Sequence, residues 1–105
     1  MTGWTYLIIA GLLEIGFASM IKLTENFTKI FPTILFILFA MASFYMLTKA
    51  IESIPIGTAY AVWTGIGAIG TVIVGIVFYN DPVSFLRLFF ISMLIFSIVG
   101  LKLVS

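Results

Sequence analysis

The residue with the clearest chemical potential in this sequence is Glu14, a carboxylate inside a long apolar stretch near the N-terminus. The other formally charged residues lie at or near the ends of such stretches. A charge at the centre of a bilayer costs about 2.5–3.5 kcal/mol on insertion scales, so a residue placed there is a functional candidate by default. The structural alternative is that Glu14 stays protonated or bonds to a neighbouring helix. We favour a binding role.

Two residues share the face of Glu14 if the stretch is helical, because residues three or four positions apart are neighbours on a helix. Gly11 precedes Glu14 by one turn and leaves room for a ligand or a neighbouring backbone. Phe17 follows it and adds an aromatic surface beside the carboxylate. Gly11, Glu14 and Phe17 therefore form the first half of a predicted site.

A second stripe with the same spacing consists of Tyr60, Trp63, Gly67 and Gly70. A phenol can hydrogen-bond a carboxylate, and the face of an indole can stack on a cation. Aromatic residues also form belts at membrane interfaces, but Trp63 lies deeper in its stretch than a belt residue normally does. We therefore predict that Tyr60 and Trp63 belong to the site.

Small and hydroxylated residues complete the predicted site. Ser43 is the clearest hydroxyl in the middle of an apolar stretch, and it can bond Glu14 or the backbone one turn earlier. Its position in the sequence does not choose between these two partners. Gly65, Gly67 and Gly70 permit close packing of membrane helices or bending during a conformational change. The sequence leaves these two interpretations of the glycines open.

This set of groups suits a hydrophobic or delocalised organic cation. It does not suit a metal ion, since a single carboxylate per chain is a poor ligand set. Removal from water favours the protonated form of a carboxyl group, so Glu14 is expected to exchange a proton near neutral pH. A cation and a proton would then compete for one carboxylate, as an antiport cycle requires.

The elements that must position these residues follow from composition. Of the 105 residues, 63% are hydrophobic and 9% are charged, whereas soluble domains are about 45–50% apolar and about 25% charged. A helix needs about 20 apolar residues to cross a bilayer. Four such stretches are predicted, at residues 3–21, 30–48, 56–79 and 83–104, in one all-α integral membrane domain that spans residues 1–105.

Other classes of protein are disfavoured by what the sequence lacks. It contains no cysteine and no histidine, so disulfides, thiolate metal sites and the commonest general base are absent, and we expect no enzyme. The net charge is only +1 and the basic residues are not clustered, so the sequence does not predict a surface that binds nucleic acid.

The basic residues at the stretch ends are nearly balanced. Lys49 and Lys102 fall on one side, and Lys22, Lys29 and Arg87 fall on the other. Orientation in a membrane follows the excess of Lys and Arg in short loops, so this balance either predicts no orientation or predicts both, paired in an antiparallel dimer. In the last stretch we expect subunit contacts from an apolar stripe, although lipid-facing helices look the same: Ile91, Leu94, Ile95 and Ile98.

Residues 54–67, with the sequence IPIGTAYAVWTGIG, resemble the third-helix signature of the small multidrug resistance transporters. The resemblance extends over essentially the whole chain. Its other parts are Glu14 followed by Lys22, the Phe27-Thr28 loop with Pro32 after it, Ala42-Ser43-Phe44, and Gly100-Leu101-Lys102.

The resemblance implies an antiparallel, dual-topology homodimer in the cytoplasmic membrane that exports organic cations in exchange for protons by alternating access. The proton motive force would drive it, with no cofactor. Glu14 of both subunits would bind protons or substrate, Tyr60 would orient the carboxylate or contact substrate, and Trp63 would stack on the substrate. On this basis we predict that Ser43 hydrogen-bonds Glu14, and that Gly11 and Phe17 shape the pocket.

Residues 57–75 look most like the guanidinium-exporting branch of that family. In that branch a tryptophan usually lies one turn after the glutamate, where this chain has Phe17. Guanidinium, substituted guanidiniums and quaternary ammonium compounds therefore all remain as substrates, and a heteromeric transporter subunit remains an alternative. The rivals from other classes are an accessory subunit of another transporter and a passive cation channel.

Overall fold

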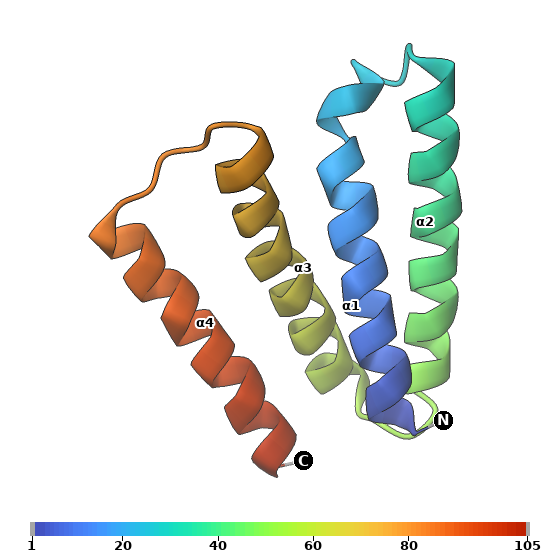
Figure 1. Ribbon diagram of the computed structural model, residues 1–105. Coiled ribbons are helices and arrows are strands. Elements are labelled where there is room, and N and C mark those ends of the chain that lie inside the picture. The colour runs from blue at the N-terminus through green and yellow to red at the C-terminus, as the bar shows by residue number, and fades with distance from the viewer. Residues whose placement is uncertain (1, 105) are drawn as a thin grey trace.

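The computed structural model describes residues 2–104, which form four long α-helices and no strand. The helices are α1 (Gly3–Met20), α2 (Ile30–Ala50), α3 (Ile56–Phe78) and α4 (Phe85–Val104), with a short 3-10 helix, η1 (Lys22–Thr24), after α1 (Figure 1). Each long helix is apolar enough and long enough to cross a membrane. The all-α fold with four candidate spans is therefore confirmed, and no helix end departs from its predicted span by more than two residues.

Local sequence explains where the helices begin and turn. The Thr2 side chain caps α1 by accepting a hydrogen bond from the Thr5 backbone N–H at 3.2 Å, and Pro55 directly precedes α3, where the first turn requires no donor. Between η1 and α2, three successive residues have φ of 47°, 63° and 65°, which reverses the chain within a few residues: Glu25, Asn26 and Phe27.

The first helix is the centre of the arrangement. α1 packs against α2 on one side and α3 on the other, and α4 packs mainly against α3 (Figure 1). Successive helices run in opposite directions, so α1 and α3 run in the same direction (Figure 1). The predicted antiparallel neighbours are found at α1–α2 and α3–α4, whereas α2 and α3 touch little because each packs on α1.

The buried core is small and lies around the α1–α3 contact. Its members are Leu7, Ala10, Ala50, Ile54, Ala59, Val62 and Trp63. Many large apolar side chains lie on the outside, which is the arrangement that a hydrocarbon solvent permits.

The fourth helix contains no buried residue. Its predicted contact stripe is shared with α3 of the same chain, because the side chains of Leu94 and Ile98 lie over Gly65. The expectation that the stripe faces a second subunit therefore needs correction for these two residues. Ile95 of the same stripe is 45% exposed.

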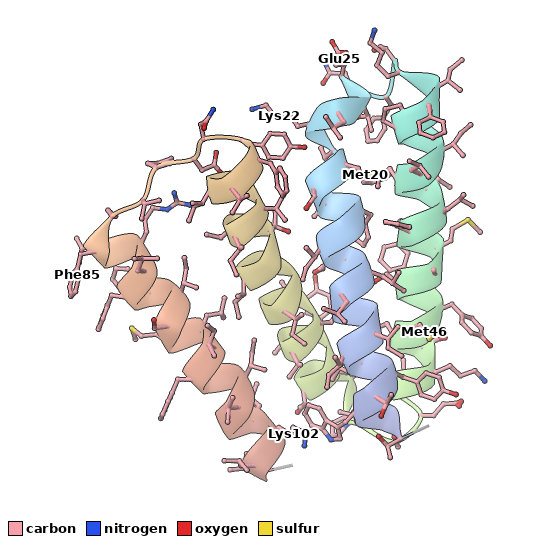
Figure 2. The ribbon with its side chains drawn as sticks, viewed as in Figure 1. Met20, Lys22, Glu25, Met46, Phe85 and Lys102 are labelled. Carbon is pink, nitrogen blue, oxygen red and sulfur yellow. The ribbon has the colours of Figure 1, made fainter. Side chains whose placement is uncertain are left out.

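Charged residues gather at the two ends of the bundle. Figure 2 shows Lys22 and Glu25 at one end and Lys102 at the other. The Lys22 ammonium lies 5.0 Å from the centre of the Tyr79 ring, and the Lys102 ammonium lies 5.6 Å from a ring centre of Trp4. Such contacts are favourable for cations at helix ends.

Candidate functional site

Glu14 lies in α1 on the side that faces α3, and its carboxylate rests directly against Gly67. A Cβ atom at residue 67 would lie 2.8 Å from Cγ of Glu14 and closer still to the carboxylate. Glycine at residue 67 therefore leaves the room that the Glu14 carboxylate needs. The side chain is half-buried, and within residues 2–104 it forms no hydrogen bond or ion pair. Such a carboxylate is available to a proton or a cation.

The predicted pocket role of Gly11 is not what the structure shows. Gly11 is buried, and the side chain of Ile66 in α3 fills the space beside it, at 2.7 Å from a Cβ added there. Gly70 receives the side chain of Ile15 in the same way. Gly11, Gly67 and Gly70 therefore act as close-packing residues between α1 and α3, and Gly65 does so between α3 and α4.

Ser43 connects three helices, but not through Glu14. Its hydroxyl donates a hydrogen bond to the backbone carbonyl of Ala10 at 2.7 Å, and the indole Nε1 of Trp63 donates to the Ser43 oxygen at 2.9 Å. The predicted bond from Ser43 to Glu14 is therefore wrong for this conformation, because the single hydroxyl proton is already used. Ser43 instead holds the backbone of α1 one turn before Glu14.

The two aromatic residues of α3 differ in exposure. Trp63 is 8% exposed, whereas Tyr60 is 58% exposed, and their ring centres lie 5.7 Å apart. Tyr60 precedes Gly67 by about two turns, or roughly 10 Å along the helix axis. It therefore does not orient the Glu14 carboxylate within this chain, and its exposed ring is free to meet a substrate or a second subunit.

Phe17 points toward α2 and not toward the carboxylate. Its ring centre lies 5.6 Å from that of Phe36 and 6.0 Å from that of Phe44. Phe44 in turn lies 5.6 Å from Trp63. Phe17 thus joins an aromatic layer that links α2 to Trp63, and the structure brings Glu14 and Phe17 together only as neighbours along α1.

A cavity of about 300 Å³, not predicted from the sequence, lies between the C-terminal halves of α1 and α3. It begins one turn beyond Glu14, and Thr71 and the charged residues Lys22 and Asp81 lie in its wall. The signal was present in the sequence, since Thr71 follows Gly67 by four residues and therefore shares its helix face. Among residues 2–104, no group of three or more acidic, His or Cys residues could hold a metal ion.

The family comparison agrees with this architecture. The Small Multidrug Resistance protein family matches residues 2–95 of the chain. The chain belongs to this family. The resemblance carried by residues 54–67 is thereby confirmed, and the protein is a multi-pass protein of the cell membrane.

Curated relatives match over nearly their whole length. A guanidinium exporter of Proteus vulgaris is 46% identical over 102 residues, which cover 97% of this chain and 98% of that protein. A guanidinium exporter of Citrobacter freundii is 45% identical over 100 residues, or 95% of each chain. A guanidinium exporter of Yersinia pestis is 44% identical over 102 residues, with the same coverage as the Proteus protein.

Proposed function

We propose that this small multidrug resistance protein exports small organic cations, guanidinium among them, in exchange for protons. Membership of the family and the three guanidinium exporters above support efflux of a small cation. The observation that carries the proposal is the half-buried Glu14 carboxylate, which lies against Gly67 without a hydrogen-bond partner among residues 2–104.

Competition for this carboxylate is the basis of coupling. A protonated Glu14 is neutral and holds no cation, whereas an ionised Glu14 attracts one. If the site opens alternately to the two sides of the membrane, a proton bound on one side is exchanged for a cation released there. Cation binding should therefore weaken as pH falls, because the protonated fraction of Glu14 rises.

The groups around Glu14 favour a planar, delocalised cation. Guanidinium can donate two parallel hydrogen bonds to one carboxylate, and its planar face can lie on an aromatic ring. A quaternary ammonium ion has no N–H group, so the carboxylate would attract it by charge alone, without a hydrogen bond. The names of the relatives support guanidinium, while Phe17 keeps quaternary ammonium as the second candidate substrate class.

An antiparallel homodimer is the assembly that we propose. Tyr60 is exposed beside the buried Trp63, and α4 contains no buried residue, so a second copy could cover these surfaces. The near-even distribution of basic residues between the two ends is the supporting feature for dual topology.

Transport by protein in liposomes tests the function. Guanidinium and tetramethylammonium currents would be measured on a supported membrane across pH for wild-type protein and for Glu14→Gln. We expect Glu14→Gln to lose coupled transport of either cation, because the amide neither ionises nor exchanges a proton. Glu25→Gln is the matched control, since Glu25 is exposed and pairs only with Lys29 at the loop; it should transport normally.

Full coupled transport by Glu14→Gln would contradict the mechanism. Flux of cations without movement of protons would instead support a passive channel. Topology has a separate test: the chain has no natural cysteine, so one cysteine placed at Glu25 should be labelled from both sides of the membrane. A single fixed orientation would rule out the antiparallel homodimer.

A further inference from the structure

Two series of residues face each other beyond the site, both at intervals of four. In α1 and η1 the series is Glu14, Ala18 and Lys22. In α3 it is Gly67, Thr71 and Gly75, and Tyr79 continues it directly after the helix. Residues four apart lie on one helix face. Because α1 and α3 run in the same direction (Figure 1), the Glu14–Gly67 contact starts a continuous track toward the Lys22 end of the bundle.

A cavity follows this track. Its volume is about 300 Å³, and its lining includes Ala18 and Ser19 of α1 together with Thr71 and Gly75 of α3. Ala18 and Gly75 carry little or no side chain, which leaves the space between the two helices. The inner end of the cavity is therefore at the level of Thr71, one turn from the Glu14 carboxylate.

The mouth of the cavity is polar. The Tyr79 hydroxyl donates a hydrogen bond to the Ser19 carbonyl at 2.8 Å, and the Lys22 ammonium lies over the Tyr79 ring. The Asp81 carboxylate lies against Gly75 at the same end. Figure 2 shows Lys22 where the ends of α1 and α3 meet the connecting loops, so this mouth faces the aqueous phase.

Thr71 has a buried hydroxyl without a partner. Its Oγ1 atom is covered, and no group within residues 2–104 forms a hydrogen bond with it. Buried polar groups are nearly always hydrogen-bonded, so such an exception needs an explanation. A threonine in a helix populates more than one χ1 rotamer, and a rotation of Thr71 would turn the hydroxyl from its covered position into the cavity that the residue lines.

We propose that this cavity is a water-filled path along which Glu14 exchanges protons with the aqueous phase at the Lys22 end, and that the Thr71 hydroxyl relays the proton at its inner end. The inference rests on the proposed proton coupling. One helical turn is about 5.4 Å, which two successive hydrogen bonds of about 2.8 Å through one water can span. Water in the cavity has several polar partners, as a stable internal water requires.

Along this path, one proton leaves Glu14 for each proton that reaches the aqueous phase. Glu14 gives its proton to the bridging water, each oxygen along the path accepts one proton and passes another on, and one proton reaches the aqueous phase. Glu14 is left as a carboxylate, ready for a cation. Asp81 is the carboxylate at the mouth, so it can accept the proton there, while Lys22 and Tyr79 are the other titratable groups that line the cavity.

Thr71→Val tests the relay, because valine keeps the shape of threonine and removes the hydroxyl. Thr71→Ser is the matched control that keeps the hydroxyl. Three quantities would be measured in liposomes: guanidinium uptake driven by a pH gradient, guanidinium–guanidinium exchange at equal pH, and equilibrium guanidinium binding. The exchange reaction needs no net proton movement, so it reports on the substrate site alone.

We expect Thr71→Val to slow proton-driven uptake by at least about tenfold, as for loss of a positioned proton-transfer group, and to leave exchange and binding nearly unchanged. Thr71→Ser should retain coupled uptake. Normal coupled uptake by Thr71→Val would overturn the proposal, and so would an equal loss of exchange and binding, which would make the cavity part of the cation site. Absence of proton coupling in the wild-type protein would identify the proposed function, and not Thr71, as the error.

Discussion

The two halves of the α1–α3 interface are packed in opposite ways. In the half that extends from the N-terminal ends to the level of Gly70, the side chains of Ile66, Glu14 and Ile15 each fill the space over a glycine of the other helix. Toward their C-terminal ends, the helices line an open cavity whose wall includes Thr71. Glu14 lies at the boundary between the two halves. Tight packing can therefore fix a carboxylate on one side while the other side stays open to water.

The largest effect on guanidinium binding is expected from Gly67→Ala, which fills the space that the Glu14 carboxylate occupies at this boundary. The new methyl group would overlap the Glu14 carboxylate, which would have to leave its position. Loss of a well-placed pair of charge-assisted hydrogen bonds to guanidinium costs about 3 kcal/mol, so we expect the dissociation constant to rise roughly a hundredfold. Calorimetric titration of the purified protein with guanidinium measures this.

Gly75→Ala is the matched substitution in the open half. Its methyl group would meet the Asp81 carboxylate, which is exposed and free to move, and Gly100→Ala in α4 would meet nothing within 4 Å. Both should bind guanidinium about as the wild-type protein does. Equal weakening by Gly67→Ala and Gly75→Ala would show that the two halves do not differ in the way described.

A smaller effect is expected from Ser43→Ala, on the side of α1 that faces α2. The substitution leaves the buried indole N–H of Trp63 without its acceptor and removes the hydroxyl that bonds the Ala10 carbonyl. A buried unsatisfied donor costs about 1–3 kcal/mol of the free energy of unfolding, so the midpoint of thermal unfolding in detergent should fall.

The control for Ser43→Ala is Ser97→Ala in α4. The Ser97 hydroxyl is exposed and donates to the Met93 carbonyl of its own helix at 2.9 Å, so its removal should leave the midpoint almost unchanged. Equal midpoints for Ser43→Ala and the wild-type protein would mean that the link between the three helices does not contribute to stability.

The fold was predictable because its determinants are local. Apolar stretches of the right length, prolines at their beginnings and charges at their ends define four helices without knowledge of how these pack. The face of Glu14 was also predictable, since helical spacing alone places Gly11 and Phe17 near it.

The contacts between helices were not predictable in the same way. The pairing of Glu14 with Gly67, and of Ser43 with Ala10 and Trp63, depends on the register between helices, which no spacing along one helix specifies. Thr71 was overlooked for a different reason: a hydroxyl in an apolar helix usually bonds the carbonyl one turn earlier, so only the structure shows that this one has no partner.

The smallest effect, and the one that bears on substrate choice, is expected from Phe17→Trp. The Phe17 ring lies between Phe36 and Phe44 on the α2 side of α1, so an indole N–H there could reach the carboxylate only if the ring turns. One hydrogen bond contributes about 0.5–1.5 kcal/mol, and we expect the preference for guanidinium over tetramethylammonium to rise by about two- to tenfold.

Phe36→Trp is the control for Phe17→Trp. It enlarges a ring in the same aromatic layer, but Phe36 lies in α2 and is not one helical turn from Glu14 as Phe17 is. It should leave the ratio of the two transport rates unchanged, as measured on the supported membrane. If Phe17→Trp also left the ratio unchanged, the α2 side of α1 would not influence selectivity. Substrate choice would then belong to the α3 side, where Glu14 lies against Gly67 and where the exposed Tyr60 and the buried Trp63 are next to each other.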